Sequence, residues 1–272
     1  MYKGGREMRR ILLFTSIIVI GFFSFVIMKE HLQVSFYPII KNFEKNRIMK
    51  SLEDYQTINT EHFTVYFKEK ERDIGEITGE IIEDHYDEIC SYFDYYPTED
   101  IPIIIYEKGE DIIDTIKLKG ETPPLRVYYS GTINLLSPNI WLSGDNIGEE
   151  YRKTTPVIHE FTHLIVDAKT KGNYPLWLTE GLALFLEERI IGFEWNGGIG
   201  KTSDITLKDL NDNFDNIETD IAYRKSFEMV RYLNSKYEFD KFNLLLDNLG
   251  MGSNIDTSLK KVFRFSISEF SY

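Results

Sequence analysis

Short apolar runs separated by turn-forming residues mark the first half of the chain. HFTVYF at 62–67 and IPIIIYE at 101–107 are rich in β-branched and aromatic residues, which predicts buried strands. LRVYY at 125–129 and NIWLS at 139–143 lie between glycine, proline and serine residues, and we expect strands there as well. The pattern predicts a mixed β-sheet in this half.

A helical period governs the other segments. A helix is predicted over 74–93, because apolar residues recur there every three or four positions, at 74, 77, 81, 82, 86 and 89. From residue 154 onward the same period predicts helices near 155–168, 176–191, 221–237 and 240–249. Strands followed by helices, without an internal repeat, indicate an α+β fold.

The first 58 residues have a different pattern. After a short basic N-terminus at 1–10, an uncharged apolar run extends from Ile11 to Met28, about the minimum length of a bilayer-spanning helix. The run is longer than the apolar region of a cleaved signal peptide, and no small-x-small cleavage site follows it. We therefore expect residues 11–28 to be an uncleaved transmembrane signal anchor. Residues 29–58 are expected to be a partly helical juxtamembrane connector in front of one domain at 59–272.

The orientation of this anchor is indicated by the basic residues around it. The adjacent Arg9 and Arg10 at the membrane edge favour an N-terminus in the cytoplasm, with the domain outside it. Basic residues also follow the run, so the inverted orientation stays open. We expect a single-pass protein of the cell membrane with an extracytoplasmic domain.

Charge and cysteine usage narrow the class further. The net charge of −13 would repel nucleic-acid phosphates, so no nucleic-acid partner is expected. The single cysteine, Cys90, cannot form an intrachain disulfide, and its apolar helical surroundings indicate a buried structural thiol.

The segment TTPVIHEFTHLIVD at 154–167 carries the main chemical signal. Thr154 or Thr155 can cap a helix here, and Pro156 suits its first turn. His159 and His163 are four residues apart, hence about 40° apart around a helix and about 6 Å along it, so that both imidazoles can reach one zinc ion. The alternative is an amphipathic helix with two histidines and no metal.

A third ligand candidate makes the metal interpretation stronger. Glu180 lies in NYPLWLTEGLALFLEE, 17 positions after His163, where Pro175 can open a second helix. A helix–turn–helix of this length can bring Glu180 back to the metal. Two histidines and one glutamate would leave a fourth position for water, as in catalytic zinc sites.

These motifs resemble the gluzincin zinc metallopeptidases, specifically the peptidase-MA-like family. HEFTH and PLWLTEGLA carry the resemblance, which extends over about residues 58–272. It implies a zincin-like domain with one Zn²⁺ held by His159, His163 and Glu180, and Glu160 as general base in peptide hydrolysis. In related families a tyrosine or histidine follows the glutamate helix, which makes Tyr223 a candidate oxyanion donor. A core aromatic residue is the equally weighted alternative for Tyr223.

Several neighbouring residues have more than one interpretation. Asp167 could accept a hydrogen bond from a ligand imidazole, or could be a solvated residue of the helix end. Glu187 and Glu188 are expected on an exposed face. NIWLSG stands where gluzincins place the edge strand that binds extended substrate, so we expect that role there.

Other signals bear on activity. The Gly-x-Met-Glu-Asn signature of gluzincin aminopeptidases is absent, which favours an endopeptidase. The Gly-Lys-Thr at 200–202 lacks the glycine that a phosphate loop requires at position 195 and is better explained as a glycine-rich turn. His31, His62 and His85 have no ligand-like spacing.

The sequence thus predicts a membrane-anchored zinc metallopeptidase that cleaves peptide or protein substrates. Two other classes stay open. One is a zinc-binding, peptidase-like module that binds a partner without cleaving it, and the other is an anchor protein with coincidental histidines. The presence of Glu160 favours catalysis over the first of these, and Glu180 argues against the second.

Overall fold

The computed structural model describes residues 32–118, 122–144, 146–193, 202 and 204–270. Within these ranges, no helix has both the length and the apolarity needed to cross a membrane. The expected anchor at 11–28 lies outside the described residues, as do His31 and most of the glycine-rich segment at 195–204.

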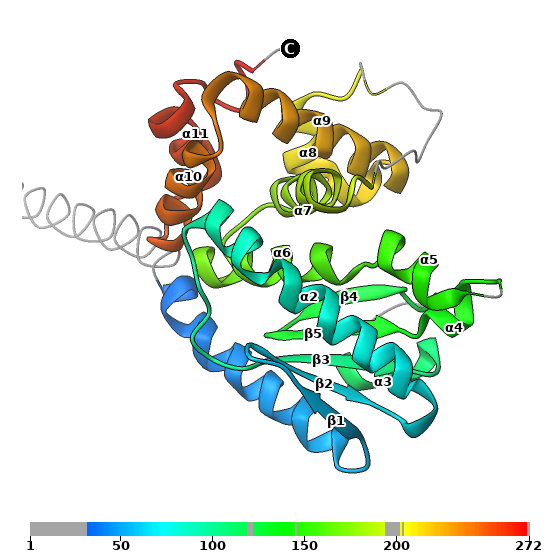
Figure 1. The fold of residues 1–272 in the computed structure, drawn as a ribbon. Coiled ribbons are helices and arrows are strands. Elements are labelled where there is room, and N and C mark those ends of the chain that lie inside the picture. The colour runs from blue at the N-terminus through cyan, green and yellow to red at the C-terminus, as the bar shows by residue number, and fades with distance from the viewer. Residues whose placement is uncertain (1–31, 119–121, 145, 194–201, 203, 271–272) are drawn as a thin grey trace, which may run out of the picture.

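A five-stranded mixed sheet forms the centre of one half of the molecule (Figure 1). Its spatial order is β1-β2-β3-β5-β4, with three parallel central strands and an antiparallel strand at each edge. The strands are β1 (Gln56–Asn59), β2 (Phe63–Phe67), β3 (Ile101–Tyr106), β4 (Arg126–Tyr129) and β5 (Thr132–Leu136). The result is the mixed sheet that the apolar runs predict.

Helices cover both faces of this sheet, which explains why every residue of β3 is buried. Ile103 and Ile105 point toward the large core under α2 (Arg72–Phe93) and α6 (Val157–Thr170). The alternate residues of β3, Ile104 and Tyr106, join a second apolar cluster on the opposite face.

That second face is covered by α3 (Gly109–Ile116) and by a helix that includes residues 32–49. Ile48 from this helix and Leu52 from the following 3₁₀ turn (Lys50–Leu52) belong to the second apolar cluster. Residues 29–58 were expected to be a connector. Within its described part, the helix at 32–49 packs on the sheet and residues 56–58 belong to β1, so this part is integral to the folded body.

The helices that follow α6 in the chain gather on its side away from the sheet (Figure 1). They are α7 (Leu176–Ile191), α8 (Leu207–Asn213), α9 (Thr219–Tyr237), α10 (Asp240–Gly250) and α11 (Ile255–Phe263). α7 and α9 approach very closely at Gly181, where an added Cβ would lie 2.5 Å from the carbonyl oxygen of Ser226. Only a residue without a side chain fits there, and it follows Glu180 directly.

The predicted strand at 139–143 is wrong. Residues Pro138–Trp141 form a short helix, α4, and α5 (Ile147–Thr154) follows it. The cause is local, because Ser137 caps the turn by accepting a hydrogen bond from the Asn139 backbone N–H, and Pro138 fits the first helical position.

The strand preceding this helix, β5, is part of a hairpin that the apolar pattern did not reveal. Ser130 and Gly131 both have positive φ and connect β4 to β5 as a two-residue turn between paired Tyr129 and Thr132. The strands expected at 62–67, 101–107 and 125–129 are confirmed, as are the helix over 74–93 and the four expected after residue 154. Cys90 is buried as expected, and burial raises the pKa of its thiol to about 12.

Candidate metal centre and active site

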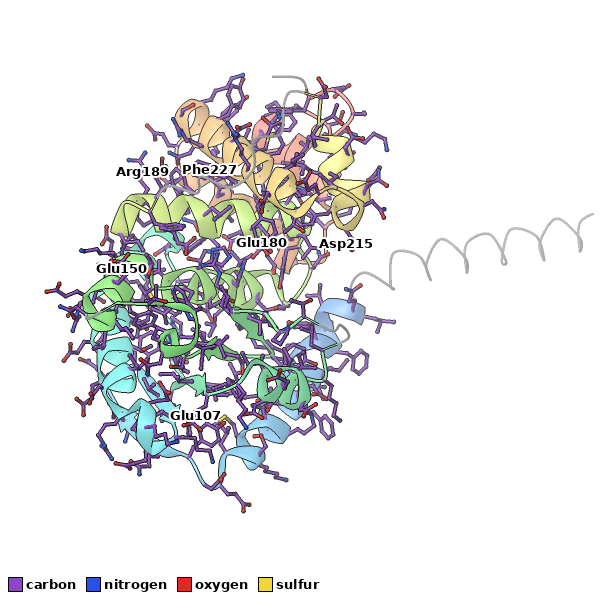
Figure 2. All side chains as sticks on the ribbon, turned by 90° about the vertical axis from the view of Figure 1, so that its right-hand side faces the viewer. Glu107, Glu150, Glu180, Arg189, Asp215 and Phe227 are labelled. Atoms are coloured by element: carbon purple, nitrogen blue, oxygen red, sulfur yellow. The ribbon has the colours of Figure 1, made fainter. Side chains whose placement is uncertain are left out.

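Three of the residues singled out in the sequence converge between α6 and α7. The Nε2 atom of His159 lies 3.2 Å from Oε2 of Glu180, and Nε2 of His163 lies 3.6 Å from the same oxygen. Both histidines belong to α6, one helical turn apart, with ring centroids 4.5 Å from each other. In Figure 2, Glu180 lies between the helical half and the sheet half, whereas Arg189 of the same helix lies at the periphery.

These separations fit a zinc ion. Ligand atoms around a tetrahedral zinc with bonds of about 2.0–2.1 Å are about 3.3 Å apart, close to the two distances here. Ligand-type atoms of His159, Glu160 and His163 also lie within 4.8 Å of one another. Glu180 matches a shared ion better than Glu160, because one of its oxygens is near both Nε2 atoms.

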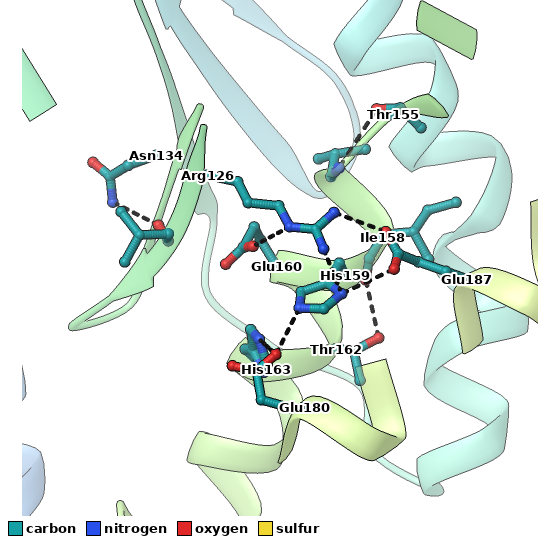
Figure 3. A network of polar contacts seen from close by, with 12 residues as sticks. Arg126, Asn134, Thr155, Ile158, His159, Glu160, Thr162, His163, Glu180 and Glu187 are labelled. Carbon is teal, nitrogen blue, oxygen red and sulfur yellow. Dashed lines mark hydrogen bonds and ion pairs between the residues drawn. The ribbon is translucent and has the colours of Figure 1, made fainter. Parts of the chain in front are cut away.

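The other ring nitrogens are held by hydrogen-bond partners. Nδ1 of His159 lies 3.0 Å from Oε2 of Glu187 (Figure 3). Nδ1 of His163 lies 2.6 Å from Oγ1 of Thr179. The ionised Glu187 carboxylate can only accept, so it selects the His159 tautomer whose Nε2 lone pair is free for a metal. The Thr179 hydroxyl can accept from Nδ1 of His163 in the same way. The donor set and the hydrogen bonds around it are therefore compatible with a histidine-ligated metal.

Burial and the neighbouring charges set the protonation of this cluster. Burial and Arg126 lower the pKa of His159, but Glu187 and Glu180 outweigh them and raise it to about 9. Burial opposes ionisation of Glu180 and Glu187, yet the histidines near both, and Arg126 near Glu187, hold both carboxyl pKa values below the ordinary range. The carboxylates are charged at neutral pH, as metal ligation and imidazole orientation require.

Arg126 enters the site from the edge strand β4. Its Nη1 lies 3.0 Å from Oε1 of Glu187 and its Nε lies 3.4 Å from Oε1 of Glu160 (Figure 3). Burial opposes its charge, but Glu187 and Glu160 raise the pKa of the guanidinium. Its Nη2 also lies 3.2 Å from Nδ1 of His159. Since a guanidinium only donates, that contact and the His159–Glu187 bond cannot both be hydrogen bonds, and the raised pKa of His159 favours the bond to Glu187.

A pocket of about 230 Å³ opens onto this cluster. β4 forms one wall with Arg126, Val127 and Tyr128, and Tyr223 of α9 contributes to the lining. Burial, then the charge of Glu180 and a hydrogen bond with it, raise the pKa of Tyr223, so its hydroxyl stays protonated and can donate. The structure thus brings Tyr223 to the same pocket as Glu160 and the three ligand candidates.

Asp167 and Glu187 both lie in surroundings that differ from those expected. Asp167 lies away from the imidazoles and accepts hydrogen bonds from Tyr37, from Tyr128 at 2.6 Å and from Lys41 at 2.6 Å. Glu187, expected on an exposed face, is only 1% exposed and bonds His159. The helical period explains this difference, because Glu187 is seven residues after Glu180 and shares its buried face of α7.

Arg126, Thr179 and Glu187 are site residues that sequence reasoning missed. The seven-residue spacing from Glu180 was a usable signal for Glu187, whereas nothing local distinguishes Arg126. NIWLSG does not supply the edge strand, because its first three residues lie in α4 and the rest form no strand. The strand beside the pocket is β4. Glu188 is partly exposed and pairs with Arg231, and His62 and His85 contact Glu83 and Glu88 outside this pocket.

The fold and the pocket together define a zinc-metallopeptidase-like domain. The chain belongs to the Peptidase MA superfamily, whose family model matches residues 95–271. No curated protein matches the chain significantly. Among solved structures, the fold is similar to that of native leukotriene A4 hydrolase from Saccharomyces cerevisiae, with a TM-score of 0.51 and 16% sequence identity. The match covers 78% of this chain and 36% of that one, so the chain spans little more than a third of that protein.

Proposed function

We propose that this protein is a membrane-anchored zinc metallopeptidase that hydrolyses internal peptide bonds. The observation that carries the proposal is the convergence of His159, His163 and Glu180 in one pocket that also holds Glu160. The two imidazoles and the Glu180 carboxylate would hold one Zn²⁺. When bound, zinc would supply Lewis-acid activation of water and of the scissile carbonyl.

Glu160 is the proposed general base. It follows the first ligand candidate on α6, is almost fully buried and lies beside Arg126. In this role its carboxylate accepts a proton from the attacking water and passes it to the amine that leaves when the C–N bond breaks. Arg126 holds the Glu160 carboxylate in place by direct contact. It also contacts Glu187, which orients the His159 imidazole.

Tyr223 is the proposed donor to the carbonyl oxygen as negative charge develops on it. Its position in the pocket and its raised pKa support this role, because a protonated hydroxyl is available at neutral pH. Substrate in extended form would lie along β4, whose free edge borders the pocket, and backbone hydrogen bonds would position the scissile bond.

The proposed membrane anchoring rests on the uncharged run at 11–28. In this arrangement the catalytic domain lies outside the cytoplasm.

A second candidate function is a zinc-binding module that binds a partner at the cell surface without cleaving it. Both functions use the same ligands, and only the first needs the carboxylate of Glu160.

The test combines metal content and cleavage in the full chain purified in detergent. We expect one zinc per chain, retained in Glu160→Gln and lost in Glu180→Ala. Mass spectrometry of a denatured-protein digest should show new internal termini with the parent chain and none with Glu160→Gln. Stepwise removal of terminal residues would instead indicate an exopeptidase. Zinc without cleavage by the parent chain would favour the partner-binding module, and absence of zinc after metal is supplied would end the metallopeptidase interpretation.

A further inference from the structure

The helix at 32–49 has two apolar faces. Its inner face contributes Val34 and Ile48, both buried, and is fastened to α6 through Tyr37 and Lys41, which bind Asp167. Its other face, called here the outer face, consists of large apolar side chains that are 40–69% exposed: Leu32, Phe36, Ile39, Ile40 and Phe43.

The outer face is a continuous stripe. Leu32, Phe36, Ile40 and Phe43 follow one another at spacings of three and four residues, and Ile39 lies beside Ile40, so the five align on one side of the helix. The described residues include twelve large apolar side chains that are exposed, and five of them belong to this stripe. Such a concentration marks a contact surface, whereas single exposed apolar residues need no explanation.

Because its inner face is bonded to Asp167 of α6, the helix cannot rotate to bury the stripe. Asp167 is fully buried and binds Lys41 at 2.6 Å and Tyr128 of β4 at 2.6 Å. Rotating the helix to bury the outer face would break these bonds and expose Ile48. The described residues of the chain therefore leave the stripe uncovered.

Sequence immediately before the helix indicates what covers the stripe. The uncharged apolar run ends at Met28, only four residues before Leu32, a reach of at most about 14 Å. If that run crosses the bilayer, the stripe, which is about 16 Å long, begins at the membrane surface. Residues 32–50 also carry four basic side chains and one acidic one, against a net charge of −13 for the whole chain. This segment is thus basic within an acidic chain, and anionic lipids would repel it less than the chain as a whole.

We propose that the outer face lies on the lipid bilayer, with its apolar side chains at the boundary between headgroups and acyl chains. The inference rests on the membrane anchoring proposed above and goes beyond it. Anchoring alone would leave the domain free to rotate relative to the membrane. Lipid contact by the outer face would fix the orientation of the whole domain, because Asp167 joins this helix to α6 and to β4 beside the active-site pocket. Substrates would then be peptide segments close to the membrane surface.

Site-directed spin labelling of the full chain tests this arrangement. Cys90 is first replaced by alanine, and single cysteines are placed at Ile39, Ile40 or Phe43, with matched exposed apolar controls at Leu244 of α10 and Met251 beyond it. The protein is reconstituted in vesicles of phosphatidylcholine with phosphatidylglycerol. We expect labels on the outer face to collide more with oxygen than with a water-soluble nickel chelate, and the two controls to show the reverse.

Three other outcomes have distinct meanings. If the outer-face labels match the controls while a label at Ile20 is lipid-exposed, the anchor stands and the lipid-contact inference is overturned. If the labels are shielded from both reagents and broadened by a neighbouring label, the face is covered by a second copy, which also overturns it. If the Ile20 label is aqueous and the outer face is in lipid, the contact stands without the anchor.

Photoreactive phosphatidylcholine provides a second measurement on the unlabelled chain. Lipid adducts should map to residues 32–49 by mass spectrometry. Absence of adducts there, with adducts at 11–28, would contradict the proposal without depending on any substitution.

Discussion

Nδ1 of His159 lies 3.0 Å from Oε2 of Glu187, a buried carboxylate two turns beyond Glu180 on α7. The same imidazole meets Glu180 through Nε2 at 3.2 Å. One face of α7 therefore supplies both the proposed third metal ligand and the group that orients the first histidine. The site consequently depends on the helical register of α7 as much as on HEFTH.

Replacing Glu187 should weaken zinc binding while leaving the ligands in place. In Glu187→Gln the carboxylate that accepts from Nδ1 is lost, and we expect zinc affinity to fall by about 10–100-fold. The measurement is competition with a chromogenic chelator. Glu188→Gln is the matched control, since Glu188 is partly exposed and pairs with Arg231, and it should bind zinc like the parent chain. Equal zinc affinities of the two variants would show that Glu187 does not support metal binding.

Zinc binding should release a proton and tighten as pH rises. The pKa of His159 is raised to about 9 in the metal-free protein, so below that pH its imidazole is protonated, and a metal must displace the proton from Nε2. Apparent affinity should therefore increase by up to about tenfold per pH unit between pH 7 and 8. Calorimetry in buffers of different ionisation enthalpy measures the released proton directly. A flat affinity over this range would mean that His159 is already neutral.

Removal of the Tyr223 hydroxyl should affect turnover more than substrate binding. If it donates to the developing oxyanion, Tyr223→Phe should lower kcat by about 10²–10³-fold with little change in KM and in zinc content. Tyr232→Phe changes a tyrosine of the same helix that does not line the pocket, and it should retain activity. A Tyr223→Phe variant as active as the parent chain would leave Tyr223 as a packing residue.

Gly181 should be intolerant of even one methyl group. A Cβ there would lie 2.5 Å from the Ser226 carbonyl oxygen and 2.6 Å from a Val230 methyl, so α9 would have to move away from α7. We expect Gly181→Ala to lower the free energy of unfolding by about 1–3 kcal/mol, measured by urea denaturation. In Gly148→Ala the new methyl meets only the end of the Ile77 side chain, which can move, and little loss is expected. Equal stability of the two variants would contradict the close packing of α7 and α9.

Asp167 should matter for stability and not for zinc. Asp167→Asn removes the negative charge of a carboxylate that pairs with Lys41 and accepts a hydrogen bond from the Tyr128 hydroxyl. We expect a loss of about 2 kcal/mol, below the range for fully buried pairs because the Lys41 side chain is 21% exposed. Asp247→Asn breaks a more exposed pair with Lys169 and should cost about 0.2–1 kcal/mol. Zinc affinity is measured in parallel, and a fall in Asp167→Asn would restore the metal-site role considered from the sequence.

Local rules were enough for most of the chain. The four-residue spacing of His159 and His163 fixes their common face once a helix forms, and Pro175 and the apolar period locate the helix that carries Glu180. Runs of β-branched and aromatic residues predict β2 and β3, because such residues suit a buried or half-buried strand. Every residue of β3 is buried, and every second residue of β2. The strand expected at 139–143 was wrong because the Ser137 cap and Pro138 outweigh the apolar character of the segment.

The sequence by itself determined the spacing of the candidate metal ligands, the candidate base and the α+β order of elements, since these depend on patterns within single helices and strands. Tertiary structure alone decided which polar groups lie beside them. Arg126 reaches Glu160 from a strand 34 residues earlier in the chain, and Asp167 turns away from the histidines to hold Tyr37 and Lys41. A buried charge is stable only when it is paired with other polar groups. Here those groups come from segments distant in the sequence, and no local periodicity predicts which distant segments will meet.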